Sequence, residues 1–161
     1  MEAREHMQRV QGMMVYLCSL ANGLEMLLGR GSESICFRAG RNVGLKWKVE
    51  QKDKDFVKAV GLVQKEMLRM GINWPIKPFK KSTEPQLIEK DEKGQSVKLA
   101  VENCIVRCTL ARYGFPQKGS LCNTKHGLFC GLLDQTCGTK STMEIIHAGE
   151  NGCMLRLRIL G

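Results

Sequence analysis

The sequence predicts an α+β fold, in which N-terminal helices pack on an antiparallel sheet. Over residues 1–72, apolar side chains recur every three or four positions, the spacing that gathers them on one face of a helix. From Gln86 onward, β-favouring residues surround short turns, which is the pattern of antiparallel hairpins. A Cys-bearing helix is expected between two such hairpins. We therefore expect a single domain over residues 1–161, with a helical part at about 1–72 and a β-rich part at about 73–161.

Three helices are predicted in the first part. The first ends near Gly29, and its apolar stripe has heptad-like spacing, so it faces either a core or a second copy of the chain. The stripe consists of Met7, Val10, Met14, Leu17, Ala21, Leu24 and Leu28. The second helix begins after Ser32 and carries Gly40 and Gly44, a spacing that lets another backbone or a ligand approach closely. The third runs from about Asp53 to Met70.

The second part begins with "GINWPIKPFKKSTEP", whose three prolines predict an irregular segment. "PQLIEKDEKGQSVKLAVENCIVRCTLARYG" predicts two strands around a turn at Asp91 to Gly94, with the second strand running on through Cys104 and Cys108. A helix follows Leu121 and ends at Gly138. "TMEIIHAGENGCMLRLRIL" then forms a hairpin with "AGENG" as its turn.

Composition narrows the class of protein. No apolar run reaches the ~18 residues of a membrane span, and the charged start is unlike a signal peptide, so we expect a cytoplasmic protein. The net charge of +9 is concentrated in basic residues between Arg41 and Lys81. This charge permits binding to nucleic acid or another phosphate-bearing partner, but a solvated basic surface is the interpretation we favour.

A disulfide framework is the weaker interpretation of the eight cysteines, because nothing in the sequence indicates secretion. In the helix after Leu121, Cys122, His126, Cys130 and Cys137 share one stripe. Cys122 and His126 are four residues apart and could ligate one metal, whereas Cys130 and Cys137 are expected to be buried in the core. Cys122 is the stronger candidate because a helix N-terminus favours a thiolate.

The last hairpin carries further candidate ligands. A regular five-residue turn places His147 opposite Cys153 on the inner face of the sheet, close enough to share a metal. The same register places Glu144 on the outer face opposite Arg156, where the two form a cross-strand ion pair.

Three segments in order resemble the 4-vinyl reductase family of small-molecule-binding domains: "FRAGRNVG", "CNTKHGLFCGLL" and "MEIIHAGENGCMLRL". The family includes sensor domains of aromatic-responsive bacterial activators and hydrocarbon-binding proteins. The resemblance implies helices packed on an antiparallel sheet, a homodimer, and a structural zinc beside the ligand pocket. By the same resemblance the zinc ligands are Cys122, Glu144, His147 and Cys153.

The sequence departs from the family pattern twice. His147 stands where the family has Cys, and the turn before Cys153 is about two residues shorter. Histidine is a good zinc ligand. The regular hairpin, however, turns Glu144 away, so either a bulge near Ile146 restores it or His126 takes the fourth place.

The resulting hypothesis is a module that binds or senses a small apolar or aromatic molecule, with structural zinc, acting through dimerisation or a partner protein. The alternative is a tetrapyrrole-related reductase or an iron–sulfur redox protein using Cys104, Cys108, Cys122 and Cys130. The sequence shows no Gly-rich dinucleotide loop, nucleophile elbow or catalytic carboxylate pair, so we expect binding rather than catalysis. A third hypothesis is a nucleic-acid or partner-docking module that uses the basic middle of the chain.

Overall fold

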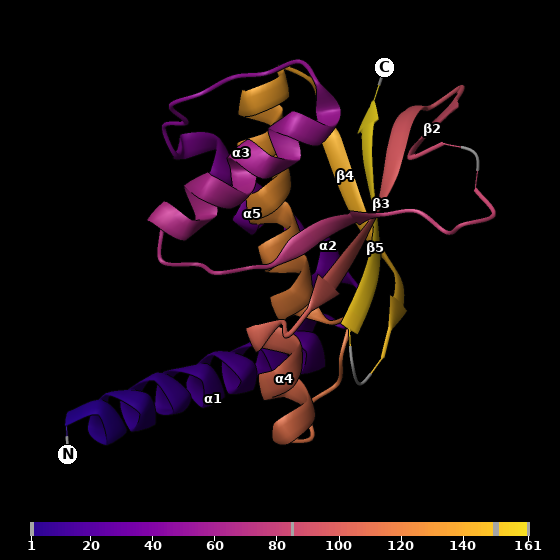
Figure 1. Ribbon diagram of the computed structural model, residues 1–161. Coiled ribbons are helices and arrows are strands. Elements are labelled where there is room, and N and C mark those ends of the chain that lie inside the picture. Colours follow the sequence, from indigo (N-terminus) through magenta and orange to yellow (C-terminus); the bar gives the residue numbers. More distant parts are fainter. Residues whose placement is uncertain (1, 85, 150–151, 161) are drawn as a thin grey trace.

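The computed structural model describes residues 2–84, 86–149 and 152–160 and has the predicted α+β architecture (Figure 1). Its helices are α1 (Glu2–Leu28), α2 (Gly31–Lys46), α3 (Phe56–Arg69), α4 (Ile105–Arg112) and α5 (Ser120–Cys137). Its strands are β1 (Ile76–Phe79), β2 (Ile88–Asp91), β3 (Gly94–Glu102), β4 (Ser141–Ala148) and β5 (Gly152–Leu160). Within these described ranges, no helix has the length and apolarity needed to cross a membrane.

The strands form one antiparallel sheet in the order β1–β3–β5–β4. β2 shares an edge of β3 with β1: β1 pairs with residues 98–101 and β2 with residues 94–97. β3 and β5 pair along their full length, from Gly94 opposite Leu160 to Glu102 opposite Gly152. Alternate side chains therefore point to one face, and those on the inner face are buried: Val97, Leu99, Val101, Leu155 and Leu157.

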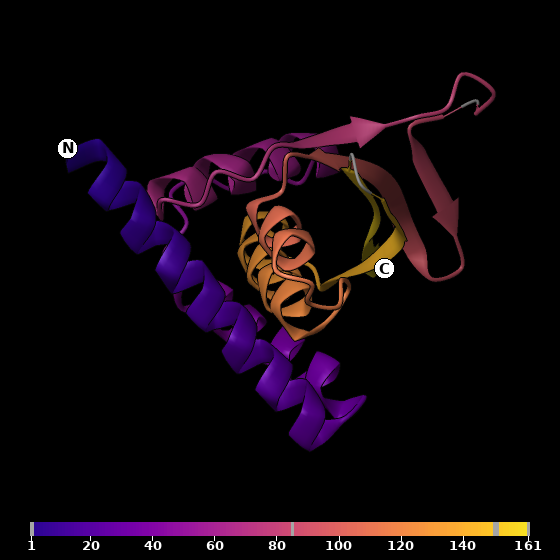
Figure 2. The same cartoon turned by 90° about the horizontal axis from the view of Figure 1, so that it is seen from below.

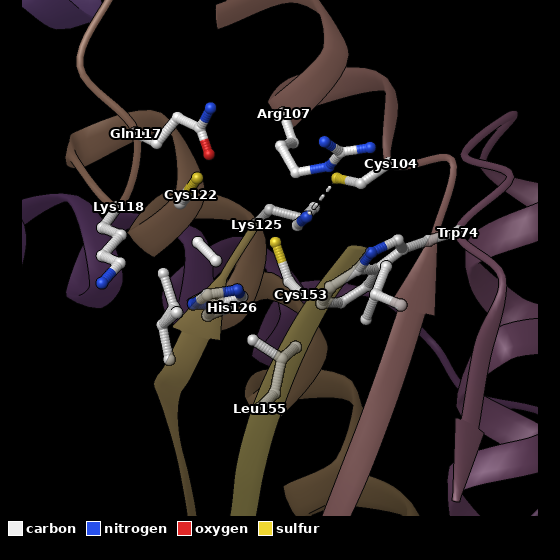
Figure 3. A pocket seen from close by; sticks show the side chains of 13 residues that line it. Trp74, Cys104, Arg107, Gln117, Lys118, Cys122, Lys125, His126, Cys153 and Leu155 are labelled. Atoms are coloured by element: carbon white, nitrogen blue, oxygen red, sulfur yellow. Dashed lines mark hydrogen bonds between the residues drawn. The ribbon is translucent and has the colours of Figure 1, made fainter. Parts of the chain in front are cut away.

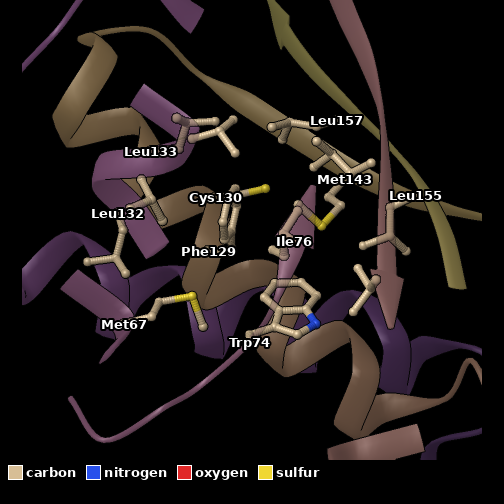
Figure 4. Close-up of a cluster of buried hydrophobic side chains, with 14 of the residues drawn as sticks. Met67, Trp74, Ile76, Phe129, Cys130, Leu132, Leu133, Met143, Leu155 and Leu157 are labelled. Atoms are coloured by element: carbon tan, nitrogen blue, oxygen red, sulfur yellow. The ribbon is translucent and has the colours of Figure 1, made fainter. Parts of the chain in front are cut away.

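Helix α5 lies between the sheet and the helices α1 and α2, as the view from below shows (Figure 2). Its Phe129, Leu132 and Leu133 are fully buried in the core, together with Leu155 and Leu157 of β5 (Figure 4). The αL conformation of Gly138 ends α5, as predicted. Helix α5 is thus the central element of the core.

Helices α2 and α5 pack through glycines. A Cβ added at Gly40 would lie 1.9 Å from the Thr124 carbonyl oxygen, and one at Gly127 would lie 1.9 Å from the Phe37 carbonyl oxygen. At Gly44 and Gly131, one turn further along, an added Cβ would lie 2.4 and 2.3 Å from a backbone carbonyl oxygen of the other helix. Of the two uses proposed for Gly40 and Gly44, close approach of another backbone is therefore the one that the structure has.

Helix α1 is anchored through its C-terminal half. The Glu25 carboxylate accepts a hydrogen bond of 2.5 Å from the Ser120 backbone N–H at the start of α5. This places a negative charge at a helix N-terminus, where it is favourable. Cys18 and Ala21 are the buried residues of α1, so most of the helix surface remains exposed.

The outer face of the sheet is charged. Arg156 donates to Glu144 across β4 and β5 at 2.8 Å, which confirms the predicted ion pair. Lys98 pairs with Glu89 at 3.0 Å on the same face. The sheet therefore has one polar face and one buried face, as expected for an antiparallel sheet covered by helices on one side.

The sequence prediction was wrong for the segment that follows β3. The second strand ends at Glu102 instead of continuing through Cys104 and Cys108, and α4 follows it. Asn103 has φ +49°, a left-handed conformation that ends the strand and that Asn tolerates better than most residues. The β-branched residues of "IVRCTLAR" resemble a strand, but Val106 and Leu110 share a buried helical face.

The proline-containing segment also differs from the prediction, because it contains the short strand β1. Pro78 lies opposite Leu99 of β3. β1 is at the edge of the sheet, which is where a proline is tolerated in a strand.

The glycine contact gives a stability prediction. Gly127→Ala should lower the free energy of unfolding by about 2 kcal/mol or more, because its methyl group meets the α2 backbone, which cannot move locally. Gly61→Ala in α3 is the matched control: a Cβ there meets nothing within 4 Å, so it should raise stability by roughly 0.5–1 kcal/mol. Urea unfolding measures both. Equal effects of the two substitutions would contradict the packing described.

Candidate functional site

A small pocket lies between the N-terminal turns of α5, the start of α4 and the inner face of the sheet (Figure 3). Its apolar wall consists of Trp74, Val101, Ile145 and Leu155. Its cavity volume is about 10 Å³, which is room for roughly one water molecule. Binding of anything larger therefore requires some of the lining side chains to move.

Lys125 extends across the polar side of this pocket. Its ammonium donates to the Cys104 sulfur at 2.8 Å and lies 4.0 Å from the centroid of the Trp74 ring, a cation–π contact. The side chain is half-buried. The pocket thus holds a positive charge against an aromatic face.

His126 is buried beside Lys125 and stacks on Trp74, with ring centroids 5.8 Å apart. Burial, with a smaller contribution from the Lys125 charge, lowers the pKa of His126 to about 3. His126 is therefore neutral at physiological pH, with one ring nitrogen able to donate and the other able to accept.

Two neighbouring rings of the pocket each carry a polar atom that has no hydrogen-bond partner among the described residues. These atoms are Nδ1 of His126 and Nε1 of Trp74, and both are buried. Since buried polar atoms are paired in the large majority of cases, two such atoms on neighbouring side chains of one pocket indicate a place for a ligand or water.

Three cysteines also line the pocket: Cys104, Cys122 and Cys153. Burial raises the pKa of the Cys122 and Cys153 thiols, so both are protonated at neutral pH without a metal. Cys104 precedes α4 and is the acceptor for Lys125. All eight cysteines are free thiols, in agreement with the expectation.

The last hairpin has a different register from the one predicted. Ala148 lies opposite Cys153, and His147 lies opposite Met154, because the pairing shifts between Ile145 and His147. The bulge near Ile146 that the family resemblance required is therefore present, but it turns His147 outward rather than Glu144 inward. The middle of the predicted turn, Glu150 and Asn151, lies outside the described residues.

The structure divides the four candidate zinc ligands between the two faces of the sheet. Cys122 and Cys153 line the pocket, whereas Glu144 is paired with Arg156 and His147 is exposed. His126, the alternative ligand, lies in the pocket one turn after Cys122. Across the described part of the chain, no three His, Cys, Asp or Glu side chains are arranged to hold a metal ion. The four ligands expected from the resemblance therefore do not fit one metal in this arrangement.

The four cysteines considered for an iron–sulfur cluster also lie apart. Cys104 and Cys122 line the pocket, while Cys108 is exposed on α4. Cys130 is buried two helical turns beyond Cys122, roughly 12 Å along α5. A cluster held by these four thiols would require α4 and α5 to be rearranged.

Comparisons with known proteins bear on the fold. No protein-family model matches the sequence, and no curated protein matches it. Among solved structures, the chain is similar to the phenol-responsive sensory domain of the transcription activator PoxR, determined with phenol. The TM-score is 0.60 at 13% sequence identity, over 91% of this chain and 74% of that one. This chain shares the fold of that sensory domain. Membership of the 4-vinyl reductase family stays a prediction.

Sequence reasoning did not identify Trp74 and Lys125 as site residues. Trp74 lies in the proline-containing segment before β1, which has no helical or strand period, and it is 5% exposed. Lys125 directly precedes His126 in α5, so the helical stripe that contains Cys122 and His126 was the signal closest to it in the sequence. The contact between Lys125, Trp74 and Cys104 joins three separate segments, and no local pattern encodes it.

The buried neutral His126 predicts a pH dependence of stability. Its folded pKa of about 3 lies below the unfolded value of 6.5, so the unfolded chain binds a proton that the folded chain does not. Stability from this group is complete above pH ~6.5 and falls as the pH drops, by about 2 kcal/mol between pH 7.5 and 5.0. In urea unfolding, the free energy of unfolding of His126→Phe should fall less than that of the wild type between pH 7.5 and 5.0, by the contribution of His126. His147→Gln changes an exposed histidine and should show the same fall as the wild type. Equal losses in wild type and His126→Phe would contradict the burial described.

Proposed function

We propose that this chain is a binding or sensing domain for a small, mostly apolar or aromatic molecule, held in the pocket beside Trp74 and His126. The observation that carries the proposal is the pair of buried polar atoms, His126 Nδ1 and Trp74 Nε1, which have no partner among the described residues at an otherwise apolar wall. An unsatisfied buried polar atom costs about 1–3 kcal/mol. A ligand hydroxyl that pairs with either atom removes that cost only in the bound state.

The size and setting of the pocket favour a ligand with a single ring. The cavity accepts roughly one water molecule as it stands, so a larger ligand must displace a side chain. Lys125 is long and only half-buried, and it can leave the Trp74 face without disturbing the backbone. The solved sensory domain that shares this fold is described as phenol-responsive, which supports a ligand of this class.

The pocket proposal predicts loss of ligand binding when the pocket is filled. Ala148 lines it opposite Cys153, and Ala148→Leu should abolish binding of phenol and benzyl alcohol. Ala111→Leu makes the same change at an exposed position of α4 and should leave binding unchanged. Titration calorimetry measures both variants. If neither compound binds the wild type, or if Ala148→Leu binds both normally, the pocket assignment fails.

We further propose that α1 pairs with α1 of a second copy. An apolar stripe on this helix faces away from the core, with Met13 60% and Leu20 53% exposed. The spacing of three and four residues in this stripe is that of a coiled-coil seam. Its members are Val10, Met13, Leu17, Leu20, Leu24 and Leu27. Glu25 holds the end of α1 on the start of α5. A conformational change in the pocket, which the N-terminal turns of α5 line, would therefore be transmitted through α5 to the α1 seam.

A charge in the seam tests this pairing. Leu20→Glu should convert a dimer to a monomer, because it places a carboxylate at the centre of the stripe. Ser19→Glu adds the same charge to an exposed position on another face of α1 and should leave the dimer intact. Light scattering during size-exclusion chromatography gives both masses. A monomeric wild type at 100 µM, or a dimeric Leu20→Glu variant, would refute the seam.

Zinc remains part of the proposal through the two pocket thiols, Cys122 and Cys153. Elemental analysis of protein purified without added metal tests it directly. Because Glu144 pairs with Arg156 on the other face of the sheet, Glu144→Gln should carry the same zinc content as the wild type.

A further inference from the structure

The residues that line the pocket carry charge of one sign only. Arg107 from α4, Lys118 from the loop before α5 and Lys125 from α5 are basic, and no Asp or Glu of the described chain lines the pocket. His126 adds no charge at neutral pH, because its pKa is about 3. Lys118 and Lys125 face no carboxylate among the described lining residues, and this gives the site a positive potential, which attracts anions.

Lys125 is the cation in closest contact with the ring of the pocket. Its described polar contacts are the Cys104 sulfur at 2.8 Å and the Trp74 ring, and no carboxylate in the described ranges pairs with it. A thiol is a weak acceptor. The other half-buried cations of the fold differ in this respect, since Arg41 pairs with Asp134 and Lys98 pairs with Glu84.

The charged and apolar parts of the pocket lie at opposite ends. Figure 3 shows Lys125 and the three cysteines together, with Leu155 at the far side along β5. Trp74 spans the two parts, with Lys125 on its ring and His126 stacked beside it. A ligand that places a charged group at Lys125 would therefore direct its apolar body along Trp74 towards Leu155.

We infer that the ligand of this pocket is an aromatic or apolar anion, of the carboxylate class, whose charged group pairs with the Lys125 ammonium. This inference rests on the proposed function and narrows it from apolar molecules in general to anionic ones. The anion replaces the Cys104 thiol as the acceptor for Lys125, and the ring takes the place of the ammonium on Trp74. Lys118, which is exposed at the rim, adds to the attraction before contact.

The pairing should appear as a selectivity between matched ligands. Benzoate and benzyl alcohol have the same ring, and only benzoate is charged at pH 7. A charge-assisted hydrogen bond in a half-buried site favours the anion by roughly ten- to a hundredfold in affinity. Titration calorimetry on the full chain measures both dissociation constants.

Variants assign the selectivity to Lys125. Lys125→Met keeps the length of the side chain and removes its charge, so it should lose the preference for benzoate while its affinity for benzyl alcohol shows that the pocket is intact. Lys140→Met removes one exposed charge outside the pocket and should keep the preference.

Each outcome decides one point. A wild type that binds benzoate at least tenfold more tightly than benzyl alcohol, with the preference lost in Lys125→Met, supports the inference. Equal or weaker binding of benzoate overturns it and leaves the proposed function standing. A preference that persists in Lys125→Met overturns the role of Lys125. Failure of both compounds to bind the wild type overturns the proposed function and this inference together.

Discussion

The close contact between α2 and α5 is the constraint on which the rest of this structure depends. Gly127 and Gly131 bring one face of α5 against the α2 backbone, where no side chain fits. This contact fixes the rotation of α5, so that Phe129 and Leu133 point into the core. Cys122 and His126 belong to the same buried surface, two turns closer to the helix N-terminus. The pocket is therefore placed by a packing contact on the other side of the helix.

The same helix explains why a small cavity remains at one end of the core. Around Phe129 and Leu133, large side chains of α3, β3 and β5 fill the space between helix and sheet. Around Cys122, the pocket is lined by the small residues Cys104, Ala148 and Cys153 together with the longer side chains of Arg107, Gln117 and Lys118. Lys125 covers this end and Trp74 separates it from the core, so the space between α5 and the sheet remains a pocket. The bulge in β4 contributes by placing Ala148, rather than His147, opposite Cys153.

The sequence was informative wherever a feature depends on local periodicity or on one turn. The helical stripes, the end of α5 at Gly138, the turn between Asp91 and Gly94 and the Glu144–Arg156 pair are all of this kind. The prediction failed at α4, because its β-branched residues suit a strand and only the left-handed Asn103 ends the sheet there. It failed for His147 because one extra residue in a bulge reverses the face of a side chain. The contact of Lys125 with Trp74 depends on how α5 sits over the segment before β1, which only the tertiary structure defines.

The central claim is that ligands enter the pocket between α5 and the sheet. The surface offers a competing site, an open groove lined by Phe37, Arg41 and Met143. A crystal structure with 4-bromophenol, using the anomalous scattering of bromine, distinguishes them directly. We expect a bromine peak between Trp74 and Leu155, with Lys125 moved off the indole ring. A peak in the open groove or along α1, with the pocket side chains unchanged, would contradict the account.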